Sequence, residues 1–151
     1  MKAAASGDLD RLRDLVSECG AYFVASGDQE GLTALQCAAD KGRIDVVRYL
    51  AGLGADPNAA DRNNVSPLMK AAGEGHLGVV RCLAGDYRAD VNAADRNGRT
   101  ALIKAACGGH LGVVYYLAGD CGADLNATDC NGRTALMEAA GEGRLDVVRC
   151  I

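Results

Sequence analysis

The sequence predicts an all-α solenoid in which short helical hairpins are stacked in register. Most of the segment DRNGRTALIKAACGGH at 95–110 is repeated as DCNGRTALMEAAGEGR at 129–144. The aspartate that begins each segment recurs at an interval of about 34 residues, which is typical of repeat proteins. Each interval contains two short segments with the apolar spacing of a helix. A unit this small cannot bury its apolar faces alone, so neighbouring units must complete the core.

Composition and charge are those of a single globular domain. The chain has 151 residues, of which 49% are hydrophobic and 24% charged, which argues against a disordered or collagen-like chain. The formal net charge of −4 gives no reason to expect nucleic acid as a partner. No apolar run reaches the roughly 18 residues that span a bilayer, and the opening MKAAASGDLDRL lacks the apolar centre of a secretory signal. We therefore expect a cytoplasmic protein that does not enter a membrane.

The first segment, 1–27, is predicted to be a partial capping unit. Its AAASGDLDRLRDLV stretch aligns with the second half of the next unit, where Arg11 and Asp14 replace Val46 and Tyr49. Polar residues on an outward face are what a terminal unit of a stack requires. Two aromatic residues that follow are expected to shield the edge of the stack: Tyr22 and Phe23.

Each later unit opens with a tight turn of the form Asp-x-x-Gly. Glycine has no Cβ and adopts positive φ without strain. Asparagine, which fills this place once, tolerates that conformation better than most other residues. The aspartates are Asp28, Asp61, Asp95 and Asp129, and the turn residues are Gly31, Asn64, Gly98 and Gly132.

A first short helix is predicted after each turn. A hydroxyl stands where the helix needs an N-cap acceptor, and Pro67 takes the first helical position of its unit, where proline is favoured. Leu35, Ala38 and Ala39 have the i, i+3, i+4 spacing of one apolar helix face, and their equivalents recur in the later units. The paired alanines are small, so neighbouring helices can approach closely. The predicted N-caps are Thr33, Ser66, Thr100 and Thr134.

A second helix is predicted after each Gly-Arg or Gly-His turn. In the first full unit it carries Ile44, Val47 and Leu50 on one face. Asp45 and Asp146 fall in the first turn of this helix in their units, where the helix dipole favours negative charge. Two units contain one residue more than the 33 of the first full unit, and we expect it in the loop GDYRAD or GDCGAD after the second helix. A loop absorbs an insertion at little cost.

The sequence of the units resembles the ankyrin repeat. The family's Thr-Pro-Leu-His segment stands here as TALQ, SPLM, TALI and TALM, and its Gly-His turn as Gly-Arg or Gly-His. The resemblance covers nearly the whole chain and implies helix-turn-helix units with β-turn or hairpin fingers. The last helix pattern, RLDVVRCI, breaks off partway, so we expect the sequence to be cut from a longer array. The resemblance divides the chain into a capping unit at 1–27, units at 28–60, 61–94 and 95–128, and an incomplete unit at 129–151.

The sequence predicts no enzyme, no cofactor and no metal site. It has no P-loop, no nucleophile elbow and no dinucleotide-binding glycine fingerprint, and both histidines fall in Gly-His turns. The seven cysteines form no Cys-x-x-Cys pair and are expected to be reduced thiols of a cytosolic protein. Cys107 with His110, or Cys121 with Cys130, lacks the spacing of zinc ligands.

Binding is the remaining function, and the residues that vary between units indicate where it occurs. Ankyrin partners usually contact the fingers and the exposed face of the first helix, and basic side chains dominate the variable positions there. They could simply keep the fingers soluble, since surface charges contribute only ~0–1 kcal/mol each. Alternatively they form a basic groove for an acidic or phosphorylated segment, held by arginine forks. The predicted partner-binding residues are Arg62, Val65, Lys70, Arg96, Arg99, Lys104, Arg133 and Glu138.

We therefore expect a non-catalytic scaffold that binds another protein through its concave face and finger tips. If the basic groove exists, reversing Arg99, Lys104 and Arg133 to Glu should abolish capture without lowering stability. The first alternative is a regulatory or targeting arm of a larger protein, such as a protein kinase. A weaker alternative is nucleic-acid or nucleotide binding through the basic finger residues, which lack stacking aromatics. A monomer is expected, with self-association through the C-terminal end as the alternative.

Overall fold

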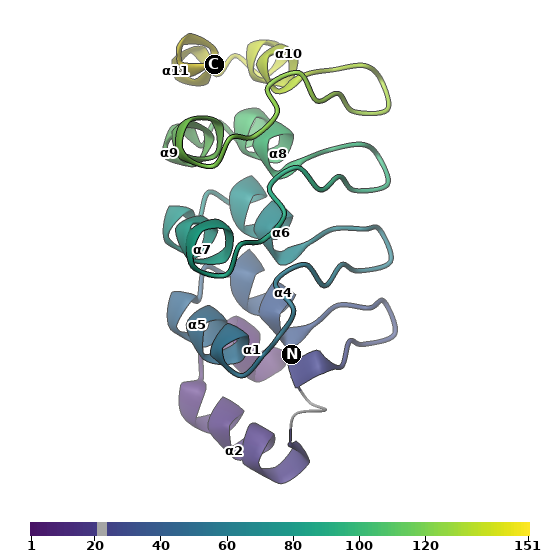
Figure 1. Cartoon of the computed structure of the whole chain (residues 1–151), viewed down its shortest axis with the longest axis vertical. Helices are drawn as coiled ribbons and strands as arrows, with labels where there is room; N and C mark the ends of the chain where they lie inside the picture. The colour runs from purple at the N-terminus through teal and green to yellow at the C-terminus, as the bar shows by residue number, and fades with distance from the viewer. Residues whose placement is uncertain (21–23) are drawn as a thin grey trace.

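The computed structural model describes residues 1–20 and 24–151. Figure 1 shows helical hairpins piled along one long axis, with their helices in two columns and the fingers projecting to one side. This arrangement confirms the predicted all-α solenoid. Tyr22 and Phe23, which were expected to shield the first edge, lie outside the described residues.

Each unit that opens with a finger contributes a first and a second helix to the two columns. The capping segment contributes α1 (Lys2–Ser6) and α2 (Leu9–Cys19). Because α1 packs beside the next first helix, it stands in for a first helix at this end of the stack. Arg11 and Asp14 on α2 are exposed, as a capping unit requires. The first helices are α4 (Ala34–Asp40), α6 (Pro67–Gly73), α8 (Ala101–Gly108) and α10 (Ala135–Gly141), and the second helices are α5 (Ile44–Gly52), α7 (Leu77–Arg81), α9 (Leu111–Tyr115) and α11 (Leu145–Cys150).

The starts of the first helices are as predicted. In each unit the N-cap hydroxyl accepts a hydrogen bond from the backbone N–H three residues on, at 3.2–3.3 Å. The side-chain oxygen of Gln36 in turn accepts a hydrogen bond from the N–H of Thr33 at 2.7 Å, which completes a capping box. Pro67 occupies the first helical turn of α6. Local side-chain chemistry therefore sets where each first helix begins.

The core lies between the two helix columns and between successive units. Leu35, Leu68 and Leu102 are at most 1% exposed, and the alanine pairs beside them are fully buried. The equivalent Leu136, on α10, is 41% exposed, because among the described first helices α10 packs against α8 only. Stacking therefore completes the core, as predicted.

The extra residue of the two longer units does not lie in the loop where we expected it. Their second helices instead end in a π-helical turn, η1 (Cys82–Asp86) and η2 (Tyr116–Asp120). In η1 the N–H of Tyr87 donates to the carbonyl of Cys82, five residues back, at 3.1 Å, and η2 repeats this bond. A widened helical turn keeps these backbone groups paired, which a longer loop would not do.

The fingers and loops are joined from unit to unit by hydrogen bonds. Each finger after the first donates a backbone N–H to a carbonyl of the preceding finger, as Arg96 does to Asn63 at 3.0 Å. In the loops behind the fingers, the Asn58 side chain accepts from the N–H of Asp90 at 2.8 Å, and the next unit repeats the bond. These repeated bonds fix the register of the stack.

The Gly-His and Gly-Arg turns also join each unit to the one before it. The Nε2 of His76 donates to the carbonyl of Asp40 at 3.0 Å, and His110 bonds to Gly73 in the same way. Gly42 has a φ of 66°, and a Cβ there would lie 2.7 Å from the His76 ring. The glycine is thus required both by the turn and by the histidine of the next unit. The structural role expected for the histidines is confirmed, and the contact across units is a new finding.

Candidate partner-binding groove

The finger turns are shaped by their aspartates. In the third full unit, Oδ1 of Asp95 accepts the backbone N–H groups of Asn97 and Arg99, each at 2.9 Å. The other three aspartates make the same pair of bonds. A carboxylate that holds two amides fixes the finger and therefore the direction in which the following side chain leaves it.

A groove of about 400 Å³ lies between the fingers and the first helices, across α4, α6 and α8. Four residues from the predicted set line it together: Val65, Lys70, Arg99 and Lys104. Two acidic residues that were not predicted, Asp40 and Glu74, line it as well.

The two lysines of the groove are paired with the finger aspartates. The ammonium of Lys104 lies 2.7 Å from Oδ2 of Asp95, and that of Lys70 lies 3.8 Å from Oδ2 of Asp61. Burial alone would raise the pKa of Asp95, but hydrogen bonds from Lys104 and from the amides of Arg99 and Asn97 outweigh it, so the pKa lies below its usual value. Both lysine side chains remain partly exposed. The lysines are thus held in position and still reach the groove.

Two arginines of the predicted set converge on one buried carboxylate. Glu138 of α10 is 3% exposed and accepts from Arg99 at 3.1 Å and from Arg133 at 3.0 Å. Glu138 stands where the preceding units have Lys70 and Lys104. The carboxylate of Glu138 is covered and holds the two arginines in position. Reversing either arginine to Glu would place a second carboxylate beside a buried one, which is strongly destabilising.

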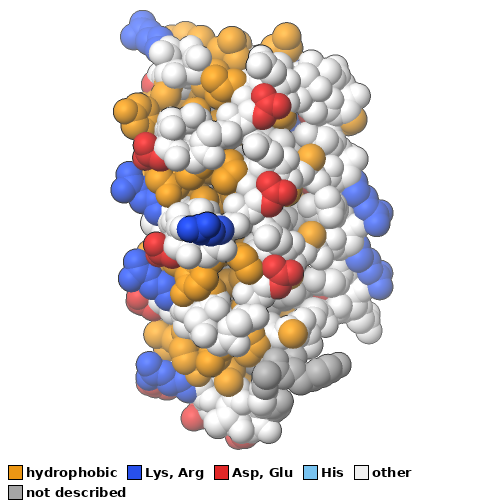
Figure 2. All heavy atoms as spheres, in the orientation of Figure 1, with side chains coloured by type: hydrophobic (Ala, Val, Ile, Leu, Met, Phe, Trp, Pro, Cys, Tyr) orange, Lys and Arg blue, Asp and Glu red, His pale blue; other side chains and the backbone are white. Residues whose placement is uncertain are grey.

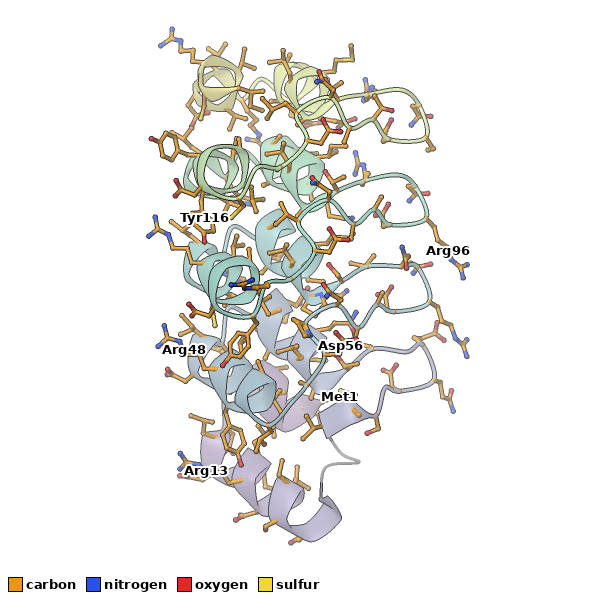
Figure 3. The ribbon with its side chains drawn as sticks, in the orientation of Figure 1. Met1, Arg13, Arg48, Asp56, Arg96 and Tyr116 are labelled. Atoms are coloured by element: carbon orange, nitrogen blue, oxygen red, sulfur yellow. The ribbon has the colours of Figure 1, made fainter. Side chains whose placement is uncertain are left out.

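The remaining two residues of the predicted set lie on the fingers. Figure 2 shows basic side chains at the finger tips, and Figure 3 shows Arg96 projecting from a tip away from the stack. Arg62 and Arg96 are both exposed, and the Arg62 guanidinium lies 3.5 Å from the Glu30 carboxylate of the preceding finger. The predicted set is therefore divided between the groove, its edge at Glu138 and the finger tips.

A different charge lies over the loops between the second helices and the fingers. Figure 2 shows a column of acidic side chains there, and Asp56 is labelled on this column in Figure 3. The equivalent residues Asp90 and Asp124 are also exposed. These three aspartates therefore place negative charge away from the finger tips.

The pairing of charges could have been found in the sequence. Each groove lysine follows its finger aspartate by the same number of residues, and the unit with glutamate at this place also has an arginine on its own finger and on the preceding one. Asp40 and Glu74 gave no such signal, because their place in the groove depends on how the units stack.

Among the residues that the structure describes, there is neither a cluster of metal ligands nor a membrane-spanning helix. No cluster of three or more histidine, cysteine or acidic side chains there could hold a metal ion. No helix among them is long and apolar enough to cross a bilayer. Burial raises the pKa of the Cys37 and Cys82 thiols, so these two are poor nucleophiles at neutral pH.

Comparison with known proteins defines the class to which this stack of units belongs. The family model described as "Ankyrin repeats (3 copies)" matches residues 1–95 and 87–151. The chain is a member of the ankyrin-repeat family, whose repeats are generally non-catalytic protein–protein interaction modules.

Three relatives illustrate how differently such units are used. The chain is 38% identical to the 2-5A-dependent ribonuclease of Mus musculus over 69 residues, which are 46% of this chain and 9% of the relative. It is 32% identical to the human transient receptor potential cation channel subfamily A member 1 over 66 residues, 44% of this chain and 6% of the channel. It is 49% identical to an ankyrin repeat protein of fowlpox virus (strain NVSL) over 39 residues, 26% and 7% of the two chains. The matches span less than a tenth of each relative.

Proposed function

We propose that this protein is a non-catalytic binding module that holds a partner protein across the groove and the finger tips, in the cytoplasm. The observation that carries the proposal is the convergence of Lys70, Arg99 and Lys104 from two units on one groove. They are ordered in advance by their own carboxylates, so a partner need not immobilise long flexible side chains, which is a large cost of binding.

Pairing with internal carboxylates leaves some hydrogen-bond donors of these cations unused. An ammonium group has three donors and a guanidinium five. Arg99 donates to Glu138 at 3.1 Å, and Lys70 lies 3.8 Å from its aspartate, which is longer than a hydrogen bond. An acidic or phosphorylated side chain of the partner can therefore add to these pairs without breaking them.

The proposal is tested by capture of proteins from a native cytosolic lysate, with quantitative mass spectrometry of what is retained. The test variant combines Arg62→Gln, Lys70→Met and Arg96→Gln, which remove charge from the groove and the finger tips and leave the buried Glu138 pairs intact. The matched control is Arg149→Gln, at an exposed site on α11. Proteins retained by the wild type and the control but lost from the triple variant would support the proposal.

An unchanged set of retained proteins would contradict it. The reversal of Arg99, Lys104 and Arg133 to Glu is a poorer test, because the structure places two of these residues against buried Glu138. Loss of capture by that variant could come from unfolding alone.

A second candidate is a regulatory or targeting arm of a larger protein. The relatives support it, since the residues that match this chain are less than a tenth of a ribonuclease and of a cation channel. Nucleic-acid or nucleotide binding through the basic fingers is a third candidate. If RNA is what the protein retains from the lysate, its binding should weaken steeply with added salt.

A further inference from the structure

We infer that the groove selects an extended polypeptide segment carrying a basic side chain and an acidic side chain about six residues apart, with its backbone laid across Gly73. The inference rests on the proposed binding function of the groove and specifies the chemistry of the partner. It comes from two observations: the order of charges along the stack, and a glycine that neither the turn nor the packing requires.

The charges that line the groove change sign along the stack. The α4 end contributes Asp40, α6 contributes Lys70 and Glu74, and the α8 end contributes Arg99 and Lys104. The Asp40 carboxylate also contacts Lys41 at 2.8 Å, but Lys41 is not part of the groove lining. A ligand that runs along the stack therefore meets an acidic end and then a basic end. Electrostatic complementarity favours a ligand with the opposite order of charges.

Gly73 lies in the middle of this groove, at the last position of α6. Its φ is not positive, so the backbone does not need glycine there. A Cβ would have one neighbour, the Cβ of Lys104 at 3.7 Å, which is an ordinary contact. Alanine would fit and has the higher helix propensity. What glycine provides is a place on the groove floor without a side chain, where another chain can approach closely.

Gly108 also lines the groove, but unlike Gly73 it has no room for a Cβ. A Cβ there would lie 3.2 Å from the carbonyl oxygen of Gly73 and closer still to the His110 ring. Packing therefore explains Gly108, and only Gly73 is left open toward the groove.

The spacing of the two ligand charges follows from the stack. Packed helices lie about 8–10 Å apart, and an extended chain advances about 3.4 Å per residue. A segment thus advances about three residues per unit, and about six residues separate the site at Asp40 from the site at Lys104. The side chains between them pass over Gly73 and Met69.

A phage-displayed library of random dodecapeptides, panned on the whole 151-residue chain, tests the inference. Enriched peptides should carry Lys or Arg and Asp or Glu four to seven positions apart. A synthetic enriched peptide, followed by fluorescence anisotropy, should bind Gly73→Ala at least tenfold more weakly than the wild type. The control Gly119→Ala, on η2 with open space around its added Cβ, should bind normally. The thermal midpoint of Gly73→Ala should equal or exceed that of the wild type, which separates loss of binding from unfolding.

A charge exchange tests the predicted polarity. Asp40, at the acidic end of the groove, is changed to Lys, and the basic residue of the enriched peptide is changed to Glu. Each change alone should weaken binding, and the two together should restore it. Restored binding would show that the basic residue of the peptide lies at the acidic end of the groove.

Three results would overturn the inference: no enriched peptide, enrichment without the opposite charges, or equal affinity for Gly73→Ala and the wild type. If enriched peptides lose affinity for the Arg62→Gln/Arg96→Gln variant but not for Gly73→Ala, the finger tips bind protein without the groove. That outcome rejects the inference and leaves the proposed binding function standing.

Discussion

At the scale of single residues, this molecule satisfies most of its charges internally. The four finger aspartates each hold two backbone amides, and two of them also hold a lysine. No buried polar side-chain atom in the described part of the chain lacks a hydrogen-bond partner. The same groups therefore shape the fingers and position the cations of the groove, so the proposed binding function would couple stability and binding at these residues.

Asp95 should make stability depend on pH. Its folded pKa is lowered, so its contribution is complete above the unfolded value of about 3.9 and is lost as the pH falls through the folded value, because the unfolded chain takes up its proton first. Asp95→Asn should cost about 1–2 kcal/mol at pH 7, in the range of a charge-assisted hydrogen bond. Urea unfolding followed by circular dichroism at pH 7 and pH 3 should show this difference shrinking in acid.

The control for this measurement is Asp120→Asn, at an exposed position on η2, which should change little at either pH. A difference between wild type and Asp95→Asn that stays constant from pH 7 to pH 3 would contradict the assignment of the contribution to ionised Asp95.

What the sequence predicts at this scale depends on how local the interaction is. The finger turn and the N-caps are formed within a few residues, and both were predicted correctly. The bond from His76 to Asp40 and the ion pair between Arg99 and Glu138 join different units. Their geometry exists only after the units are stacked, so one unit read alone does not reveal it.

At the scale of elements, short helices are viable here because their ends are satisfied. The first helices have only seven or eight residues, below the length at which isolated helices are stable in water. Each has a hydroxyl cap at its start and a neighbouring helix on at least one side. The second helices lack side-chain caps, and two of them gain a π-helical turn instead. The sequence showed the extra residue but not the π-helical turn, because the local sequence is equally compatible with an inserted residue in a loop.

Removing one cap should measure this contribution. Thr100→Ala loses the bond from the N–H of Ile103 and should lower the free energy of unfolding by about 1 kcal/mol, with a range of roughly 0.5–2. Thr100→Ser should retain most of the stability, and Thr128→Ala, at an exposed loop position, should change it by less than about 0.5 kcal/mol. Equal losses for Thr100→Ser and Thr100→Ala in urea unfolding would assign the effect to the lost methyl group and not to the cap.

At the scale of the whole molecule, stability should be unequal along the stack. In a solenoid each unit is stabilised by itself and by its nearest neighbours. The first helices α6 and α8 each have a first helix on both sides, whereas among the described first helices α10 packs against α8 only, with Met137 55% exposed. The groove is built on α4, α6 and α8, so its walls lie in the part of the stack with neighbours on both sides.

Hydrogen exchange followed by mass spectrometry should resolve this gradient. Amides of α10 and α11 should exchange first, since opening the last unit breaks one interface, whereas opening a middle unit breaks two. Amides of α6 and α8 should exchange last, with a free energy close to that of global unfolding. Exchange of α8 before α10 would contradict a nearest-neighbour stack, and identical protection in every helix would show that the chain opens as one unit. A protected groove beside a labile end would mean that the binding surface is rigid before a partner arrives, as the ordered lysines and arginines of the groove require.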